Sequence, residues 1–255
     1  MINLKTKQDL EIMRKGGKIL AEVLKEVLGH AKSGASELEL DQLAEKLILE
    51  KGGEPGFKKV ENYKHTICIS TNDAVVHGIP TPYKLRQGDV VGIDCGVYYK
   101  GFHTDMAQTI RVKSSKLKVQ SDEIDRFLET GERAMWEGIK AAKTGNRIGH
   151  ISKAIQDIVE GQGYSVVRSL IGHGVGKELH EEPEVPGFLD GNILKTPLLK
   201  IGITIAVEVI YNMGKSDVVY SNSDGWTIRT KDGSLSGLFE RTIAITDKDA
   251  LILTK

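Results

Sequence analysis

The hydrophobic positions at the start of the chain follow the period of an α-helix twice. Between Thr6 and about Ala31 they predict an amphipathic helix whose buried face carries Leu10, Met13, Leu20, Val23, Leu24 and Val27. A second helix is predicted to begin after Ser36, because Ser36 and Glu39 form a capping-box pattern that satisfies free backbone N–H groups. It is predicted to end at Gly52-Gly53.

Short apolar runs bounded by turn residues then predict β-strands. We expect strands at Thr66–Ser70, Val75–His77, Asp89–Tyr99 and Phe102–Val112. The helical period returns at about Ser121–Lys143 and Arg147–Glu160. A second set of strands is predicted at Ser165–Ile171, Ile203–Tyr211, Trp226–Thr230, Gly237–Thr246 and Leu251–Leu253.

The order helix, helix, strands therefore occurs twice, in residues 6–112 and 121–254. No clear residue-level repeat relates the two halves, and no long linker rich in proline or glycine separates them. We therefore expect an α/β (α+β) chain in which residues 1–255 form one domain. The charged run Lys113–Lys118 is interpreted as a solvated connection between the halves.

Composition narrows the class of protein. The 255 residues can bury a substantial core, and 40% hydrophobic residues exclude a disordered chain. Since 35 basic residues balance 35 acidic ones, charge favours neither nucleic acid nor an anionic membrane as partner. Two cysteines, Cys68 and Cys95, cannot form a multi-disulfide framework. No stretch has the continuous apolar run of a signal peptide or a membrane span, so we expect a cytoplasmic protein.

Two aspartates are predicted to meet on one β-hairpin. If Lys100-Gly101 forms its turn, Asp94 pairs with Ala107, and Asp105 lies on the same face as a diagonal neighbour of Asp94. Two carboxylates on a mostly apolar hairpin repel one another unless a cation neutralises them. The alternative interpretation is that both are solvated residues close to the turn.

Three further positions carry candidate metal ligands. The stretch from Gly172 to Pro183 contains His173 and His180, and its glycines predict irregular backbone that approaches a ligand closely. Glu208 and Glu240 sit inside apolar strands, where a lone charge is costly. An Asp, Asp, His, Glu, Glu set without thiolates suits two ions of the manganese, iron(II) or cobalt type better than a structural zinc. Spacing alone leaves open whether these side chains converge.

Taken together, the motifs resemble those of methionine aminopeptidases. They are Val-Val-His77-Gly-Ile-Pro, Ile-Asp94 with Gly-Phe-His-Thr-Asp105, Gly-His173-Gly with His180-Glu-Glu-Pro, Val-Glu208, Asp224-Gly-Trp226-Thr and Phe-Glu240-Arg-Thr. The resemblance runs from about Thr6 to Leu253. It implies the pita-bread (creatinase/aminopeptidase) fold, a single catalytic domain with two pseudo-symmetric halves around a central antiparallel sheet. The short stretch between Glu208 and Glu240 has no room for the helical insertion of the type 2 enzymes, which implies type 1.

The same resemblance assigns roles to site residues. It makes Asp94, Asp105, His173, Glu208 and Glu240 the ligands of two divalent ions (Co, Mn, Fe(II) or Zn), with Asp105 and Glu240 bridging both. His77 and His180 are implied to bind substrate and assist catalysis, and Glu208 to transfer a proton in addition to its ligand role. Tyr63, Cys68 and Trp226 fall at positions of the substrate pocket.

The implied activity is metal-dependent removal of the initiator methionine by attack of activated water on the first peptide bond. The implied partners are N-terminal peptides of newly made proteins, with transient ribosome association; we expect a monomer, without membrane or specific nucleic-acid binding. Three departures from the family stand out: Arg241 replaces a usual His, Val209 replaces a common Pro, and the loop Phe57–Lys64 carries unusual charges.

Two other functions fit parts of this pattern. A prolidase-like or Xaa-Pro aminopeptidase shares the fold and ligand types, but usually carries an additional N-terminal domain. A non-enzymatic peptide-binding relative typically loses ligands, whereas all five positions are occupied here. Two residues near the aspartates are expected to be structural, Cys95 as a buried thiol on the opposite face and His103 on the face opposite Asp105.

Overall fold

The computed structural model describes residues 2–112, 123–221 and 224–255; the charged run Lys113–Lys118 lies outside these residues. The helices are α1 (Lys7–His30), α2 (Glu37–Glu50), α3 (Glu123–Ala141) and α4 (Ile148–Gly161), with short 3-10 turns at Phe57–Lys59 and Ile193–Lys195. The strands are β1 (Glu54–Pro55), β2 (Ile67–Thr71), β3 (Ala74–Val76), β4 (Val90–Tyr99), β5 (Phe102–Arg111), β6 (Ser165–Val166), β7 (Gly172–Gly174), β8 (Glu181–Val185), β9 (Thr204–Asn212), β10 (Val218–Tyr220), β11 (Ile228–Thr230), β12 (Ser236–Ala244) and β13 (Leu251–Ile252).

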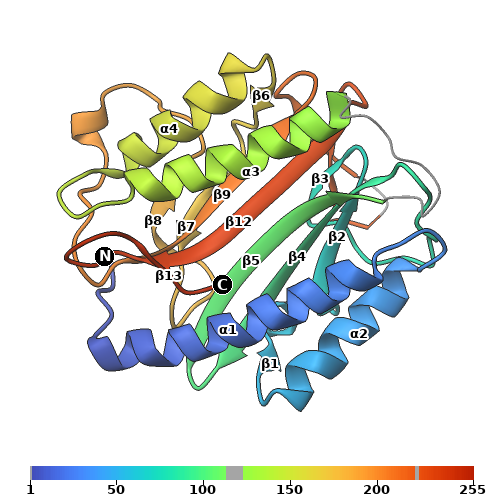
Figure 1. Ribbon diagram of the computed structural model, residues 1–255, viewed down its shortest axis with the longest axis horizontal. Helices are drawn as coiled ribbons and strands as arrows, with labels where there is room; N and C mark the ends of the chain where they lie inside the picture. Colours follow the sequence, from blue (N-terminus) through green and yellow to red (C-terminus); the bar gives the residue numbers. More distant parts are fainter. Residues whose placement is uncertain (1, 113–122, 222–223) are drawn as a thin grey trace.

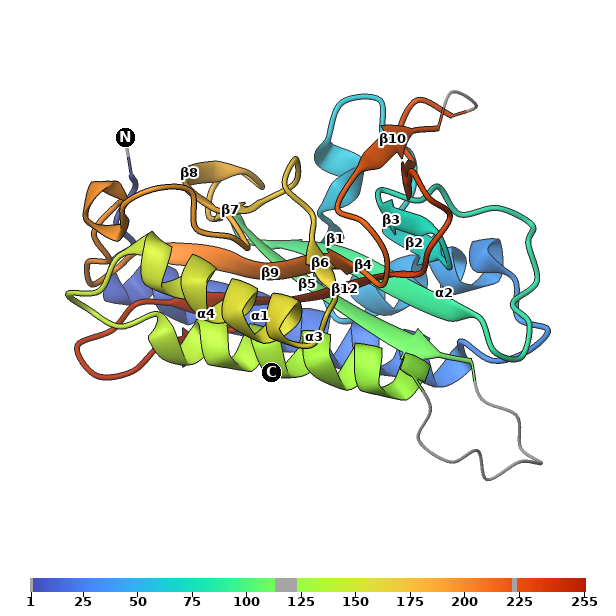
Figure 2. The ribbon, with the colours of Figure 1, turned by 90° about the horizontal axis from the view of Figure 1, so that it is seen from above.

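A large antiparallel sheet crosses the whole molecule. Its strands run in the order β1-β4-β5-β12-β9-β7-β8, with β2 added beside β4, β6 beside β9 and β13 beside β12 (Figure 1). A small sheet, β10-β11-β3, lies apart from it. Helices α1, α3 and α4 lie on one side of the large sheet, and β8 and β10 rise on the other (Figure 2). The central antiparallel sheet and the paired helices agree with the predicted fold class.

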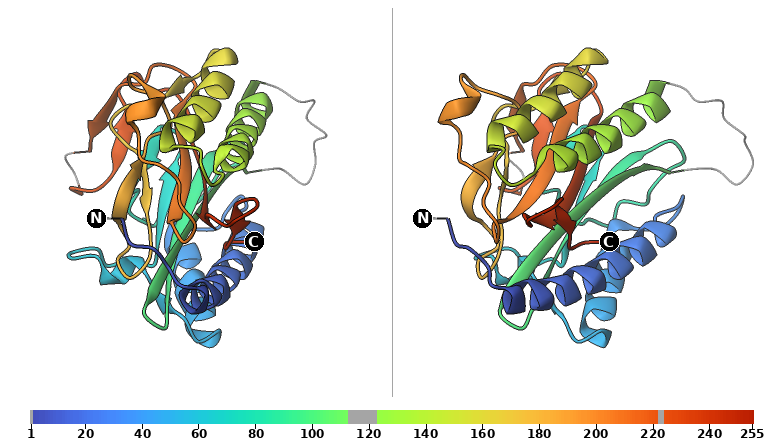
Figure 3. Two further views of the ribbon diagram at one scale, coloured as in Figure 1. Left: turned by 90° about the vertical axis from the view of Figure 1, so that its left-hand side faces the viewer. Right: turned by 60° about the vertical axis from the view of Figure 1, so that its left-hand side comes forward.

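Each half of the chain packs a helix pair on its own strands. Helices α1 and α2 cover an apolar cluster that includes Leu20 and Ile93, and α3 and α4 cover another that includes Ile155 and Val207. The two end views show the pairs side by side against one continuous sheet (Figure 3). The junction of the halves is therefore the contact between β5 and β12. The division of residues 1–255 into one domain of two halves stays a prediction.

Local sequence signals explain where the first helices begin. Thr6 caps α1 and Ser36 caps α2, and each forms a capping box with the residue three positions later, Asp9 and Glu39. The predicted hairpin is also confirmed, because Tyr99 pairs with Phe102 and Asp94 with Ala107. Lys100 and Gly101 have φ of 48° and 93°, as a tight hairpin turn with two left-handed residues requires.

The glycine-rich stretch after residue 171 was expected to be irregular, and this is wrong. It contains β7 and β8, because its glycines allow backbones to approach more closely than any side chain permits. A Cβ at Gly172 would lie 2.5 Å from the Ala206 carbonyl oxygen, and one at Gly174 would lie 2.2 Å from the Glu182 carbonyl oxygen. The expected strand Ser165–Ile171 shortens to β6, and β1 and β10 were not predicted.

A close contact between α1 and the end of the chain gives a stability prediction. A Cβ at Gly17 would lie 2.3 Å from the Leu253 carbonyl oxygen, whereas one at Gly29 of the same helix meets nothing within 4 Å. We expect Gly17→Ala to lower the free energy of unfolding by about 1–3 kcal/mol, and Gly29→Ala to raise it by about 0.5–1 kcal/mol. Denaturant unfolding of both variants measures this. Equal stability of the two would contradict the packing described.

Candidate metal centre

A single row of residues across the sheet brings the candidate carboxylates together. Cys68 of β2 is opposite Asp94 of β4, Asp94 is opposite Ala107 of β5, Ala107 is opposite Glu240 of β12, and Glu240 is opposite Glu208 of β9. Side chains of directly opposite residues in antiparallel strands lie on the same face. The side chains of this row therefore project from one face of the sheet, although the residues are far apart in sequence.

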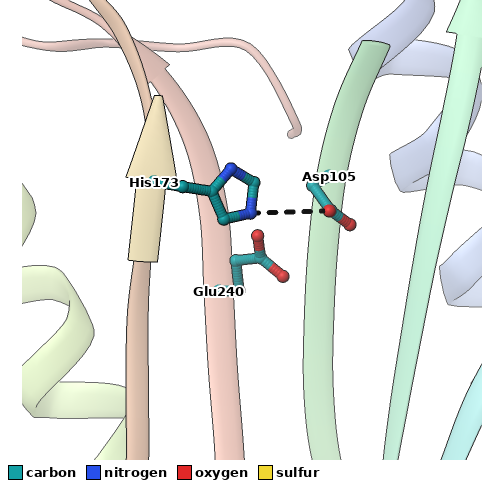
Figure 4. A group of neighbouring side chains, drawn as sticks. All are labelled: Asp105, His173 and Glu240. Atoms are coloured by element: carbon teal, nitrogen blue, oxygen red, sulfur yellow. Dashed lines mark ion pairs between the residues drawn. The ribbon is translucent and has the colours of Figure 1, made fainter. Parts of the chain in front are cut away.

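Asp105 and His173 complete the cluster from neighbouring positions. Asp105 lies two residues before Ala107 on β5, and thus on the same face. One ligand atom each from Asp105, His173 and Glu240 lie within 4.8 Å of one another (Figure 4). The His173 Nε2 atom is 4.0 Å from Asp105 Oδ2 and 3.4 Å from Glu208 Oε1. The fold thus gathers all five predicted ligands.

The imidazole of His173 is oriented by its own strand. Its Nδ1 lies 2.8 Å from the Gly174 carbonyl oxygen, so Nδ1–H donates there and leaves Nε2 directed at the carboxylates. Burial, and then the neighbouring His180 ring, lower the pKa of His173 to about 4. A neutral imidazole with one oriented lone pair is the form that binds a metal ion.

The four carboxyl groups are crowded together and largely withdrawn from water. Asp105 is 4% exposed and Glu240 2% exposed, whereas Asp94 and Glu208 are partly buried. Burial raises the pKa of all four, and the neighbouring carboxylates add to this rise at Asp105, Glu208 and Glu240. The interpretation of the two aspartates as solvated turn residues is therefore wrong. A cluster of this kind needs cations to carry its full charge.

Two orphaned oxygen atoms show that the residues fit a metal ion. Within the described parts of the chain, Asp94 Oδ1 and Glu240 Oε1 are buried and have no hydrogen-bond partner. Carboxylate oxygens with one imidazole are the donors that manganese, iron(II), cobalt or catalytic zinc accept. Cys68 lies at the end of the carboxylate row. Its Sγ accepts a hydrogen bond from the Tyr63 hydroxyl at 3.1 Å, and the residue belongs to the apolar wall of the adjoining cavity.

A cavity of about 560 Å³ opens directly over the cluster. Next to the ligands it has an apolar wall, where the Tyr63 and Trp226 rings pack edge to face with centroids 5.1 Å apart. All three pocket residues expected from sequence lie in this wall, and Phe57, Val60 and Leu179 join them without having been assigned to the pocket. They were missed because an apolar side chain in a loop carries no local sign of the cavity it will face.

Two lysines of the loop Phe57–Lys64 are bound by carboxylates outside the cavity. Lys58 Nζ binds the Glu45 carboxylate at 2.6 Å, and Lys59 Nζ binds that of Glu54 at 2.9 Å while lying over the Tyr98 ring. Neither lysine lines the cavity. The departure from the family pattern therefore leaves the apolar wall intact.

His77 and His180 line the cavity beside the cluster. His77 follows β3 in the left-handed region with φ of 57°, and the next residue, Gly78, has no space for a Cβ against the Ile69 carbonyl. The His180 ring lies 4.4 Å from that of His173, centroid to centroid. Its neighbour Glu181 forms a buried ion pair with Lys5 at 2.5 Å, which anchors the segment carrying His180.

Of the two residues expected to be structural, Cys95 lies on the predicted face of its strand and His103 does not. Cys95 is fully buried in the α1–α2 core, as expected. His103 was placed on the face opposite Asp105, and this is wrong, because residues two apart on a strand share a face. Its ring packs at 4.8 Å against Tyr98, and its backbone N–H donates to the Gly176 carbonyl, so its contacts are structural.

Comparisons with known proteins agree on one family. The profile of metallopeptidase family M24 matches residues 11–247. A methionine aminopeptidase of Clostridium perfringens is 42% identical over 254 residues, covering 100% of this chain and 99% of that one, and methionine aminopeptidase 1 of Bacillus subtilis is 42% identical over the full length of both. The crystal structure of the Thermotoga maritima methionine aminopeptidase superposes with a TM-score of 0.93 at 37% identity and complete coverage of both chains.

More distant likeness extends to prolidases. The Pyrococcus furiosus prolidase matches with a TM-score of 0.76 and 25% identity, over 99% of this chain and 65% of that one. These neighbours confirm the predicted pita-bread fold. In the described residues no helix is long and apolar enough to cross a lipid bilayer.

The charge repulsion predicts an unusual response to mutation. We expect Glu240→Gln to raise the stability of the metal-free protein by about 1 kcal/mol at neutral pH, because the raised pKa of Glu240 opposes in the folded protein an ionisation that is free in the unfolded chain, and Gln keeps the side-chain shape without this cost. The same variant should lose most of the rise in melting temperature that Mn²⁺ produces in the unmodified protein. Thermal unfolding with chelator and with Mn²⁺ measures both effects.

The matched control is Glu184→Gln at the cavity rim, where the side chain is exposed. It should change neither the stability nor the response to Mn²⁺. A Glu240→Gln protein stabilised by Mn²⁺ as strongly as the unmodified protein would contradict the assignment of Glu240 to the metal centre.

Proposed function

The chain belongs to metallopeptidase family M24, among the methionine aminopeptidases, and we propose that its cavity is the site where the N-terminal methionine of peptides and newly made proteins is released. It is a hydrolase, a metal-dependent exopeptidase. The observation that carries the proposal is that Asp105, His173 and Glu240 form a potential metal-ligand group, and that Asp94 and Glu208 line the same cavity beside them. The intact ligand set argues against the alternative of a peptide-binding module without activity.

Five residues are proposed to hold two divalent ions. These would be Asp94, Asp105, His173, Glu208 and Glu240. Cobalt, manganese, iron(II) and zinc all suit these donors. When bound, such ions polarise a peptide carbonyl and lower the pKa of a water molecule towards neutrality. The buried oxygens of Asp94 and Glu240 that lack hydrogen-bond partners support a cation at these two residues.

The side chains around the cluster have separate tasks in hydrolysis. Glu208 takes the proton of the attacking water and returns it to the leaving amine, which requires a carboxylate beside the scissile bond. His180 donates a hydrogen bond to the carbonyl oxygen as negative charge develops there. His77, beyond it along the cavity wall, orients the peptide after the scissile bond. These roles rest on position, since both histidines line the cavity beside His173.

The apolar wall is proposed to select methionine. Phe57, Tyr63, Cys68, Leu179 and Trp226 enclose the space next to the ligands without a charged group among them. An unbranched thioether side chain fits such an aromatic pocket. Apolar pockets of this kind discriminate by about 1–3 kcal/mol per methylene, which is sufficient to favour methionine over shorter side chains.

The setting of the reaction is proposed from the substrate. Newly made proteins carry their initiator methionine in the cytoplasm, and we place the protein there, acting as a monomer on emerging N-termini. Transient ribosome association is consistent with this setting. The balanced charge of the chain does not favour binding to specific nucleic acid or to a membrane.

The first test is release of free methionine from a Met-Ala-Ser peptide. Metal-free protein is reconstituted with Mn²⁺, Fe²⁺, Co²⁺ or Zn²⁺ and assayed beside Leu-initiated and Pro-initiated peptides. We expect metal-dependent release from the methionine peptide alone. Release from the leucine peptide instead would overturn the methionine pocket, and no release with ions bound would favour a binding module.

The second test concerns Glu208. We expect Glu208→Gln to lower kcat by at least about 100-fold, because the amide cannot accept the proton of the attacking water. Its circular dichroism spectrum should match that of the unmodified protein. Glu182→Gln, at the exposed rim of the same cavity, serves as the matched control and should retain activity. Near-normal turnover by Glu208→Gln would remove Glu208 from the proton path.

A further inference from the structure

The proposed metal centre straddles the junction between β5 and β12. Asp94 and Asp105 come from the first half of the chain, and His173, Glu208 and Glu240 from the second. Direct backbone pairing at this junction covers only Glu240 opposite Ala107 and Arg241 opposite Met106. The two halves of the ligand set are therefore joined by a much shorter run of paired residues than those between β4 and β5 or between β9 and β12.

A threonine hydroxyl replaces the ladder on one side of this short pairing. The Asp105 backbone N–H donates to Thr242 Oγ1 at 2.8 Å, and the same hydroxyl donates to the Asp105 carbonyl oxygen at 2.7 Å. The backbone of Thr242 is engaged by the end of the chain, because its N–H donates to Thr254 Oγ1 and its carbonyl accepts from Leu253 N–H. The Thr242 side chain therefore forms the hydrogen bonds to Asp105 that its backbone, already bonded to the end of the chain, does not form.

The same arrangement occurs on the other side with the roles of the strands exchanged. Leu238 N–H donates to Thr109 Oγ1 at 2.8 Å, and this hydroxyl donates to the Leu238 carbonyl oxygen at 2.7 Å. Thr109 lies two residues after Ala107, and Leu238 two residues before Glu240. The two hydroxyl bridges are therefore related by an approximate two-fold axis through the Ala107–Glu240 pair.

Arg241 joins the strands between these bridges from the opposite face of the sheet. Its Nη1 donates to the carbonyl oxygens of Ala107 at 3.0 Å and Glu240 at 2.7 Å, and its Nη2 donates to the Gln108 side chain at 2.8 Å. Arg241 as a whole is 9% exposed, and its guanidinium lies against the Trp136 ring. A buried positive charge is thus fixed to both strands directly behind the carboxylate row.

We propose that Thr109, Arg241 and Thr242 are positioning residues that fix the separation of the two ligand sets across the junction. This inference rests on the proposed function. The physical reason is that the strands carrying Asp105 and Glu240 are joined directly by only two residue pairs, so backbone pairing alone does little to fix their separation. Side chains that bind both strands supply the missing hydrogen bonds and keep the ligands spaced for the ions.

Mn²⁺ affinity of the metal-free protein, measured by calorimetry, tests this. We expect Thr242→Val, which keeps the shape and removes the hydroxyl, to weaken Mn²⁺ binding at least tenfold, and Thr242→Ser to restore it to within about threefold. The substitution should lower kcat and leave KM nearly unchanged, since the substrate wall lies on other elements. Arg241→Met should weaken Mn²⁺ binding in the same direction and provides an independent test if Thr242→Val does not fold.

The matched control is Thr230→Val. Thr230 is 4% exposed, and its hydroxyl donates to the Ser234 carbonyl at 2.9 Å, away from the junction. It should lose stability comparable to Thr242→Val but bind Mn²⁺ within twofold of the unmodified protein. Normal Mn²⁺ affinity in folded Thr242→Val and Arg241→Met would overturn the inference alone, whereas an unmodified protein that binds no divalent ion would overturn the proposed function as well.

Discussion

The crowding of four carboxyl groups at one site is the constraint on which the rest of this structure depends. Asp94, Asp105, Glu208 and Glu240 stand on one face of an antiparallel sheet, and burial raises the pKa of each. No arrangement of flexible loops holds such a cluster together, because loops relax away from like charge at little cost. A sheet resists this, since moving one ligand requires breaking hydrogen bonds between its strand and the neighbouring strands. The charge is tolerated because the scaffold is rigid and because divalent ions complete the site.

The two-half architecture follows from the same constraint. Each half contributes a helix pair that covers the sheet from one side, which leaves the opposite face of the central strands free for chemistry. Placing ligands on both halves means that neither half alone forms the site. The junction between β5 and β12 therefore has to be well fixed, and hydroxyl and guanidinium groups that bind both strands supplement its short backbone pairing.

The cavity combines the row of proposed metal ligands with a separate apolar wall that would contact the substrate side chain. The ligand row belongs to the large sheet, while the apolar wall comes from the Phe57–Lys64 loop and from the residues around Cys68, Leu179 and Trp226. None of these described segments contributes one of the five proposed ligands, so the wall and the ligand row come from separate parts of the chain. In this chain the charged loop residues are drawn outward by Glu45 and Glu54, so the wall remains apolar.

The sequence by itself determined the features that depend on near neighbours. Capping boxes at Thr6 and Ser36 set the starts of two helices, and the Lys100-Gly101 turn set the hairpin register that places Asp94 and Asp105 on one face, because these signals act within a few residues. The resemblance of its motifs also pointed to the family and to the ligand set. Only the tertiary structure decided that Glu240 stands between Ala107 and Glu208, and that the glycines around His173 form a strand. It also decided that the two halves are joined by the side chains of Thr109, Arg241 and Thr242. Such pairings depend on backbone groups far apart in sequence. The residues next to a threonine do not indicate whether its hydroxyl will contact solvent or a neighbouring strand.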